Sequence, residues 1–244
     1  MSFISACCNT APVASGYTPR GSMESRDGLD YYIVGGETGA QGGVVFCYDI
    51  FGLHANALQV ADLLSAAGGL CVVVPDFLEG RPLREQDLGD ASAFREFRDT
   101  RGTWAYNRRA FAAAVDVLRA RGAQRIATAG FCWGAKLSIS ALAEQEQLGV
   151  ASAALVHPSL LVREDFEKAQ GPVLLLFSKD EEDLSEGFAL LKARACGSAS
   201  FTERYQTMSH GFCAARGDFA DAEVAKHVSR VVQLSADFFR RTLA

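Results

Sequence analysis

Short apolar runs alternate along the chain with longer segments whose apolar positions recur at helical spacing, from about residue 29 to the C-terminus. The short runs are bounded by glycine, proline or aspartate, as is typical of strands buried on both faces. Several of the longer segments stop at a glycine, a common helix end. The pattern predicts strands at residues 43–48, 70–74, 125–129, 151–156, 173–177 and 200–205. It predicts helices at residues 58–67, 104–121, 134–146, 185–195 and 220–241, and a short helix with surface loops within the polar stretch 79–101.

This alternation predicts the fold class. Strands separated by helices of this length need crossover connections, so we expect an α/β protein whose mainly parallel sheet is covered by helices on both faces. Residues 1–28 are rich in Gly, Ser, Thr and Pro without apolar periodicity, and we expect a loosely ordered N-terminal lead-in there. Because no second linker follows, residues 29–244 are interpreted as one domain.

Composition and charge remove several functional classes. Lys and Arg number 24 against 29 Asp and Glu, giving a net charge of -5, which is the wrong sign for a protein that neutralises nucleic-acid phosphates. No apolar run reaches the ~18 residues that a membrane span needs. The 7 cysteines are scattered without a CxxC pair, which argues against zinc and favours free thiols in the cytoplasm, with a mitochondrial location as the open alternative.

The segment Gly130-Phe-Cys132-Trp-Gly134 lies between a predicted strand and a predicted helix. This is the context of a nucleophile elbow, a strained turn that lifts its central side chain above the sheet edge. The nearby helix N-terminus favours a thiolate at Cys132, and the N–H of Trp133 would point at a developing oxyanion. A buried packing role is the alternative for any single cysteine, so a base and an acid must follow in the sequence.

A histidine and several carboxylates follow in the expected order. His210 stands in a loop after the strand at 200–205, where a catalytic imidazole belongs in such a sheet. His157, which ends another strand, is its rival; His54 is a candidate to line the pocket, and His227 lies in the C-terminal helix.

We expect the carboxylate that orients the catalytic imidazole in the loop 180–183, which holds four carboxylates. We favour Asp183, with Asp180 second, as the group that orients the imidazole. Asp49 ends the first buried strand and is interpreted either as a turn cap or as a carboxylate that faces Cys132. In the second case the N–H of Ile50 would supply another oxyanion donor.

Several segments together resemble the dienelactone hydrolase family, an α/β-hydrolase branch with a cysteine nucleophile, and in particular its eukaryotic, fungal-type members. The segments are Asp49-Ile-Phe-Gly-Leu53, Val74-Pro-Asp76, Gly130-Phe-Cys-Trp-Gly-Ala-Lys136, His157-Pro-Ser159, and Ser209-His-Gly-Phe212 with Arg216-Gly-Asp218. They span residues from about 29 to the end of the chain.

The resemblance implies an α/β-hydrolase fold and a triad of Cys132, Asp183 and His210. It also implies an oxyanion hole from the N–H groups of Ile50 and Trp133. An acidic residue at position 49 would help to deprotonate the thiol, although bacterial members usually carry the longer glutamate there. Two arginines hold the substrate carboxylate in those members, and Arg81 and Arg216 lie near the corresponding loops.

The sequence therefore predicts a hydrolase of lactones or small carboxylic esters that works through a thioester on Cys132. It needs no cofactor or metal, and its expected partners are a small-molecule substrate and, at most, a second copy in a weak homodimer. Two alternatives stay open. One is a binding or redox-sensing protein on the same fold, and the other is a thioesterase or peptidase.

Overall fold

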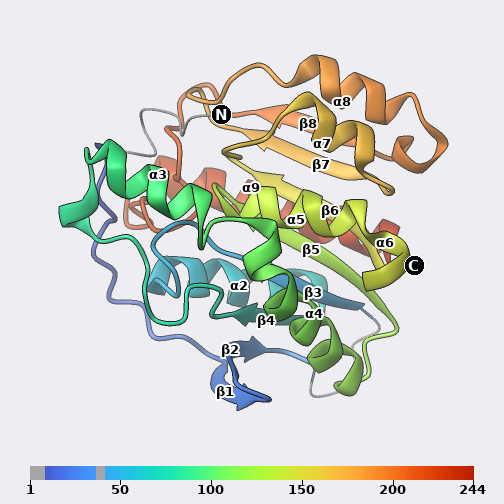
Figure 1. The fold of residues 1–244 in the computed structure, drawn as a ribbon, viewed down its shortest axis with the longest axis horizontal. Helices are drawn as coiled ribbons and strands as arrows, with labels where there is room; N and C mark the ends of the chain where they lie inside the picture. The colour runs from blue at the N-terminus through green and yellow to red at the C-terminus, as the bar shows by residue number, and fades with distance from the viewer. Residues whose placement is uncertain (1–8, 37–41) are drawn as a thin grey trace.

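The computed structural model describes residues 9–36 and 42–244. Within these ranges the strands form one eight-stranded sheet in the order β1-β2-β4-β3-β5-β6-β7-β8 (Figure 1). The strands are β1 (Ser22–Arg26), β2 (Leu29–Val34), β3 (Gly42–Cys47), β4 (Cys71–Pro75), β5 (Arg125–Phe131), β6 (Val150–Val156), β7 (Val173–Phe177) and β8 (Phe201–Arg204). The ladder from β4 through β3 to β8 is parallel, which confirms the predicted, mainly parallel α/β sheet.

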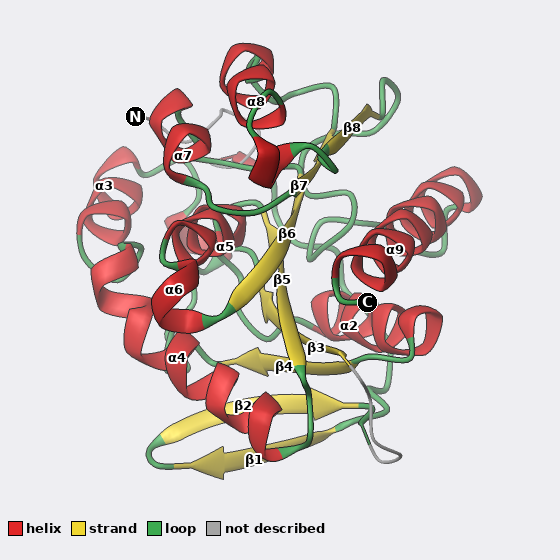
Figure 2. Ribbon diagram, turned by 90° about the vertical axis from the view of Figure 1, so that its right-hand side faces the viewer, coloured by secondary structure: helices red, strands yellow, loops and turns green. Residues whose placement is uncertain are grey.

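Helices cover both faces of the sheet, as expected. Figure 2 shows α2 and α9 together on one side, and α3 to α8 on the other. The helices are α2 (Ala55–Gly68), η1 (Glu85–Asp87), α3 (Ala91–Asp99), α4 (Trp104–Ala120), α5 (Gly134–Ala143), α6 (Gln145–Leu148), α7 (Arg163–Lys168), α8 (Ser185–Lys192), η2 (Ala195–Gly197) and α9 (Ala222–Thr242). Between these layers every residue of β3 and β4 is buried, which explains why both segments are continuously apolar.

The N-terminal part of the chain differs from the expectation of a loose lead-in. Residues 22–26 form β1, which pairs antiparallel with β2 through the turn Asp27-Gly28. Both turn residues have positive φ angles, 53° and 78°, as a two-residue hairpin turn with Asp-Gly requires. The short, polar β1 lies at the sheet edge and has an exposed pattern, so apolar periodicity could not indicate it.

Residues 9–21 have no regular strand in them, yet they are fixed to the rest of the molecule. The Tyr17 hydroxyl donates to Asp62 of α2 at 2.6 Å, and the Arg20 N–H donates to the same carboxylate at 2.8 Å. The Val13 N–H donates to the Ala215 carbonyl at 2.8 Å. The prediction of a loosely ordered segment is therefore wrong for residues 9–26, while residues 1–8 lie outside the described residues.

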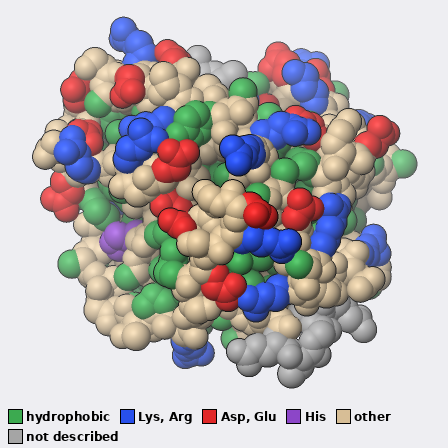
Figure 3. Space-filling view, turned by 60° about the horizontal axis from the view of Figure 1, so that its bottom comes forward, with side chains coloured by type: hydrophobic (Ala, Val, Ile, Leu, Met, Phe, Trp, Pro, Cys, Tyr) green, Lys and Arg blue, Asp and Glu red, His purple; other side chains and the backbone are tan. Residues whose placement is uncertain are grey.

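The surface carries charges of both signs. On the face drawn in Figure 3, Lys and Arg side chains are interspersed with Asp and Glu rather than gathered into one field. No helix in residues 9–36 and 42–244 combines the length and the apolar character needed to cross a membrane.

Candidate active site

Cys132 occupies the sharp turn between β5 and α5. Its φ angle is 53°, in the left-handed region that side-chain-bearing residues seldom adopt. The Cys132 N–H donates to the carbonyl of Val156 at 3.1 Å, which ties the turn to the end of β6. The sequence prediction of a strained turn at this residue agrees with this geometry.

Two glycines allow this turn to close. A Cβ atom on Gly134 would lie 2.1 Å from the carbonyl oxygen of Cys47 on β3. A Cβ atom on Gly130 would lie 2.4 Å from the carbonyl oxygen of Gly134 itself. Because backbone blocks both positions, only glycine lets α5 approach the sheet closely enough to hold the thiol at the edge.

His210 reaches the same place from the loop after β8. The Ser159 hydroxyl lies 3.6 Å from the Cys132 Sγ and 3.5 Å from the His210 Nε2, so the structure brings together the two groups that the sequence places 78 residues apart. Cys132 is 0% exposed and His210 is 3% exposed. The thiol and the imidazole are thus enclosed by protein, where electrostatic interactions are stronger than in water.

Glu181 supplies the carboxylate that contacts this imidazole. Its Oε1 atom lies 2.7 Å from Nδ1 of His210. The Ser178 hydroxyl donates to the same oxygen at 2.7 Å, and the Ser178 N–H donates to the other oxygen. These bonds fix the orientation of a fully buried carboxylate, which in turn fixes the imidazole ring.

Asp183 and Asp180, which the sequence analysis favoured as the acid of the triad, do not contact the imidazole ring, and both predictions require correction. Asp183 is exposed and accepts from the Ser185 N–H at the start of α8. Asp180 accepts the backbone N–H of His210 at 2.7 Å, so it holds the loop rather than the ring. The turn that follows β7 points the side chain at position 181 inward. The sequence signal that could have identified Glu181 is Ser178, three residues earlier, because a serine at this spacing can bond to a glutamate side chain, as in a capping box.

The charges around His210 favour its protonated form. Burial alone would lower the pKa of this imidazole, but the charge and hydrogen bond of Cys132, together with Glu181, raise the pKa to about 9. An imidazolium beside a thiol stabilises the thiolate, which is the nucleophilic form of cysteine. A protonated His210 is therefore placed to stabilise a thiolate at Cys132.

Asp49 lies at the end of β3 and is completely buried. It accepts N–H groups from Phe51 at 2.9 Å and from Ala215 at 3.1 Å, so it does cap the turn. Burial, followed by the charge of Cys132, raises the pKa of Asp49 to about 6. The carboxylate therefore caps the turn, and its action on the thiol stays a prediction.

The two residues expected to form an oxyanion hole are both buried. Ile50 follows Asp49, while Trp133 follows Cys132 and immediately precedes α5. The first N–H groups of a helix have no acceptor within that helix. The position of Trp133 at a helix start is compatible with an oxyanion donor, and the role of both N–H groups stays a prediction.

The two arginines differ in position. Arg216 is buried, its guanidinium lies 4.6 Å from the Phe51 ring centroid, and its Nε–H donates to the carbonyl of Thr10 at 2.6 Å. Its side chain packs against Gly211, the residue after His210, because a Cβ atom there would lie 3.0 Å from the Arg216 Cδ. Arg81 has an exposed side chain that bonds to Glu79 at 2.7 Å and to the Tyr106 hydroxyl at 3.1 Å. These contacts do not connect Arg81 with the thiol.

The other histidines have separate roles in the fold. The Nδ1 of His54 accepts from the Asn56 N–H and caps α2. His227 bonds to Glu223 on α9. His157, the rival imidazole, is fully buried with its ring centroid 5.2 Å from that of His210. Burial, followed by the charge of His210, lowers the pKa of His157 to about 3, so it packs against the site as a neutral ring.

Sequence reasoning did not single out the Ser159 hydroxyl, which lies 3.6 Å from the Cys132 Sγ and 3.5 Å from the His210 Nε2.

In the described part of the chain, no group of three or more His, Cys, Asp or Glu side chains is arranged to hold a metal ion.

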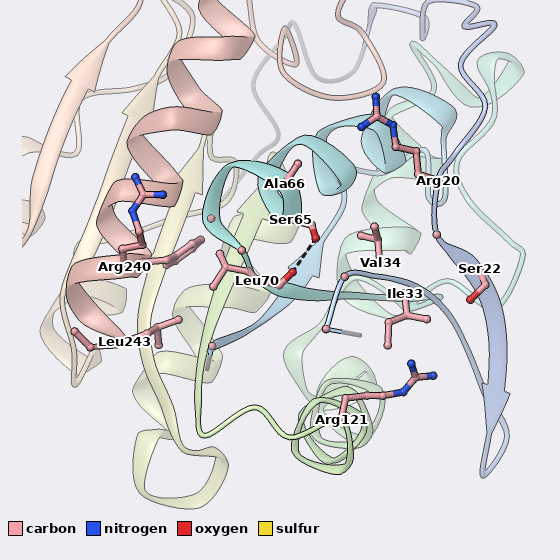
Figure 4. A pocket seen from close by; sticks show the side chains of 18 residues that line it. Arg20, Ser22, Ile33, Val34, Ser65, Ala66, Leu70, Arg121, Arg240 and Leu243 are labelled. Atoms are coloured by element: carbon pink, nitrogen blue, oxygen red, sulfur yellow. Dashed lines mark hydrogen bonds between the residues drawn. The ribbon is translucent and has the colours of Figure 1, made fainter. Parts of the chain in front are cut away.

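A large cavity lies away from this site. Its volume is about 1020 Å³, and Figure 4 shows Arg20, Arg121 and Arg240 around it. Gly42, the first residue of β3, also lines it, so it opens at the amino ends of the parallel strands. The thiol follows the carboxyl end of β5, at the opposite edge of the sheet.

A parallel sheet that carries a strained cysteine turn, a histidine after its last strand and a buried acid defines an α/β-hydrolase fold. The comparisons give the family. The dienelactone hydrolase family model matches residues 29–243, and the chain belongs to this family. An uncharacterized AIM2 family protein of Schizosaccharomyces pombe is 33% identical, with 97% of this chain and 99% of the relative covered.

Two further comparisons agree with this assignment. A carboxymethylenebutenolidase homolog of Rattus norvegicus is 28% identical over 62% of this chain and 60% of its own length. The crystal structure of dienelactone hydrolase from Anabaena variabilis superposes with a TM-score of 0.59 at 18% identity, covering 93% of this chain and 99% of that chain. At this identity the superposition establishes the fold alone.

Proposed function

We propose that this protein hydrolyses a lactone or a small carboxylic ester, with Cys132 as nucleophile, His210 as base and acid, and Glu181 as the group that orients the imidazole. Membership of the dienelactone hydrolase family supports hydrolase activity. The single observation that supports the mechanism is that a buried carboxylate contacts the His210 imidazole at 2.7 Å, while one hydroxyl lies within 3.6 Å of both that imidazole and the Cys132 thiol.

In the first half-reaction the Cys132 thiolate attacks the ester carbonyl carbon and forms a C–S bond. The carbonyl oxygen gains negative charge, which the N–H groups of Ile50 and Trp133 stabilise. When the tetrahedral intermediate collapses, the C–O bond to the leaving oxygen breaks. The imidazolium of His210 donates its proton to that oxygen, leaving a thioester and a neutral imidazole.

In the second half-reaction the neutral imidazole takes a proton from a water molecule that attacks the thioester carbon. The C–S bond then breaks, the acid product leaves, and sulfur departs as a thiolate next to the newly formed imidazolium. Each turnover thus restores the ion pair. Glu181 accepts the Nδ1–H of His210 throughout, which keeps Nε2 directed at the reacting atoms.

The first test is the hydrolysis of an activated ester by matched cysteine variants. We expect Cys132→Ala to abolish turnover, because it removes the thiol at the turn between β5 and α5. Cys71→Ala should retain wild-type activity, since Cys71 is a buried residue at the start of β4. Equal, undiminished activity in both variants would refute the proposal.

A substrate panel then separates the substrate classes. Lactones, short-chain esters, thioesters and peptides share a carbonyl but differ in the leaving atom. We expect the highest kcat/KM for a lactone or a small ester. No turnover on any of them, combined with ligand-dependent thermal stabilisation, would instead favour a binding or redox-sensing role for Cys132.

A further inference from the structure

The Ser159 hydroxyl occupies a central position between the two reacting groups. Its oxygen is 3.6 Å from the sulfur of Cys132 and 3.5 Å from Nε2 of His210. The serine is 2% exposed, so its hydroxyl is held among protein groups. A hydroxyl donates one proton and accepts others, and it can therefore bond to a thiolate and an imidazolium at the same time.

The partners of this hydroxyl distinguish it from other buried hydroxyls in the fold. Ser65 donates to the carbonyl of Leu70, and Thr128 donates to the carbonyl of Val45, so both hold backbone in place. The Ser159 hydroxyl instead contacts the side chains of Cys132 and His210. A purely structural role does not explain why this hydroxyl points at the thiol and the imidazole.

The backbone around Ser159 is built against the nucleophile turn. The Ser159 N–H donates to the Cys132 carbonyl at 3.0 Å, and the His157 N–H donates to the Leu176 carbonyl at 2.7 Å. His157 and Leu160 both have positive φ angles, 35° and 63°. Residues held in such conformations store strain that the surrounding structure must offset, and they gather at functional sites. Ser159 lies between these two positions, and its side chain is buried.

We propose that Ser159 is a positioning residue for the Cys132–His210 pair: its hydroxyl donates to the thiolate and accepts the Nε2–H of the imidazolium. The proposal rests on the proposed function and adds a fourth member to its machinery. The hydroxyl gains and loses no proton over the cycle. When sulfur bonds to the substrate carbon, its bond from the hydroxyl is lost, and it re-forms when the thiolate leaves.

The two distances from the Ser159 hydroxyl, to Cys132 and to His210, are compatible with an enzyme that has no substrate bound. At 3.5 Å the contact with Nε2 is at the long limit of hydrogen bonding. Such contacts in sites without substrate commonly shorten when the reacting groups become charged and aligned. A hydrogen bond to a charged group is worth roughly 10- to 100-fold in an equilibrium, so loss of this hydroxyl should be measurable.

The experiment compares Ser159→Ala with Ser152→Ala. Ser152 is a fully buried serine on β6 whose hydroxyl bonds to Thr242 at 2.7 Å, away from the thiol. Two readouts are taken on each variant: kcat/KM for an activated ester, and the pH dependence of Cys132 alkylation by iodoacetamide, followed by peptide mass spectrometry because other cysteines are present. Urea unfolding of each variant reports on stability.

For Ser159→Ala we expect kcat/KM to fall about 10- to 100-fold and the alkylation midpoint to move to higher pH by about one unit. Ser152→Ala should lose some stability and keep both the wild-type kcat/KM and the wild-type midpoint. An unshifted midpoint in Ser159→Ala would overturn the proposal, whatever the change in stability.

Several charged groups face the thiol, and they allow the midpoint to be assigned. Burial raises the pKa of Asp49 to about 6 and lowers the pKa of His157 to about 3. An imidazolium at His210, whose pKa is raised to about 9, lowers the pH at which the Cys132 thiolate forms. Alkylation is therefore measured from about pH 4 to pH 10, and the midpoint is compared between wild type and Ser159→Ala, which both retain Asp49 and His157.

Failure of this proposal is distinguishable from failure of the proposed function. If Cys132→Ala keeps full activity, the function itself is refuted. If Cys132→Ala is inactive but Ser159→Ala behaves as wild type in rate and alkylation, only the role of Ser159 is refuted.

Discussion

Glu181 and Asp183 lie two residues apart in one acidic loop, yet their carboxylates have opposite surroundings. The oxygens of Glu181 are buried against Ser178 and His210, while Asp183 faces solvent at the start of α8. Charge and order along the sequence could limit the acid to this loop but could not choose among its four carboxylates. The choice depends on the turn after β7, which no periodic pattern describes.

The first prediction compares the two carboxylates directly. Glu181→Gln removes the carboxylate charge and allows an amide N–H to face Nδ1, which favours the wrong tautomer, so kcat should fall by about 10²- to 10⁴-fold, as it does in comparable triads. Asp183→Asn should leave the rate within about twofold, because a surface change of this kind has a small effect. The measurement is steady-state hydrolysis of an activated ester. A large loss in Asp183→Asn with little change in Glu181→Gln would contradict the assignment.

A second prediction concerns pH. Because Cys132 and Glu181 raise the pKa of His210 to about 9, the imidazole is protonated below that pH and neutral above it. An ester with a poor leaving group needs this proton, so its kcat/KM should decline as the pH rises through about 9. A nitrophenyl ester, whose leaving group needs no proton, should decline much less. Identical high-pH limbs for the two esters would contradict the role of His210 as acid.

At the scale of elements, periodicity predicted the central sheet and most of its covering helices. β3 and β4 are apolar throughout because both faces are covered, and α9 has the long amphipathic pattern of a helix on a sheet surface. β1 was missed because an edge strand with an exposed pattern has no buried face to mark it. α7 was missed because six residues are too few for a periodic pattern.

Helix boundaries differ for identifiable reasons. The predicted helix at 134–146 ends at Ala143, since Glu144 leaves helical geometry with φ -105° and ψ 35° and a second short helix, α6, follows. The side chain of Glu144 instead accepts from Trp104 at 2.7 Å and from Arg108 at 2.6 Å. The interruption between α5 and α6 thus coincides with contacts to α4, which the sequence around Glu144 does not reveal.

The turn at Cys132 yields a prediction about packing. In Gly134→Ala the added methyl would meet the Cys47 carbonyl at 2.1 Å, so backbone must move, and we expect a loss of about 1–3 kcal/mol in unfolding free energy. Gly16→Ala is the matched control, because nothing lies within 4 Å of a Cβ there. Urea denaturation measures both. Equal midpoints for the two variants would contradict the close approach of α5 to β3.

At the scale of the whole molecule, the N-terminal segment joins structures that are distant in sequence. Tyr17 and Arg20 bond to Asp62 on α2, and Val13 bonds to the loop that carries His210. The carbonyl of Thr10 also accepts from Arg216, which lies beside the site. Polar contacts of this kind leave no periodic apolar signal, so composition alone suggested a loose segment.

We predict that this attachment contributes measurably to stability. Tyr17→Phe deletes the hydroxyl that donates to Asp62 and should cost about 1 kcal/mol in unfolding free energy. Tyr106→Phe, which removes a hydroxyl from an exposed side chain, should cost less. Urea midpoints for the two variants provide the comparison, and an unaffected Tyr17→Phe protein would indicate that the segment is not held in solution.

The central claim is that the buried sulfur at the turn between β5 and α5 becomes acylated during turnover. The most direct measurement is peptide mass spectrometry after incubation with a slowly hydrolysed lactone. The account predicts one acyl adduct, on Cys132, which accumulates when Glu181 is replaced by Gln if deacylation is then the slower step. Turnover accompanied by an adduct on another residue, or by no adduct even under rapid acid quench, would contradict it.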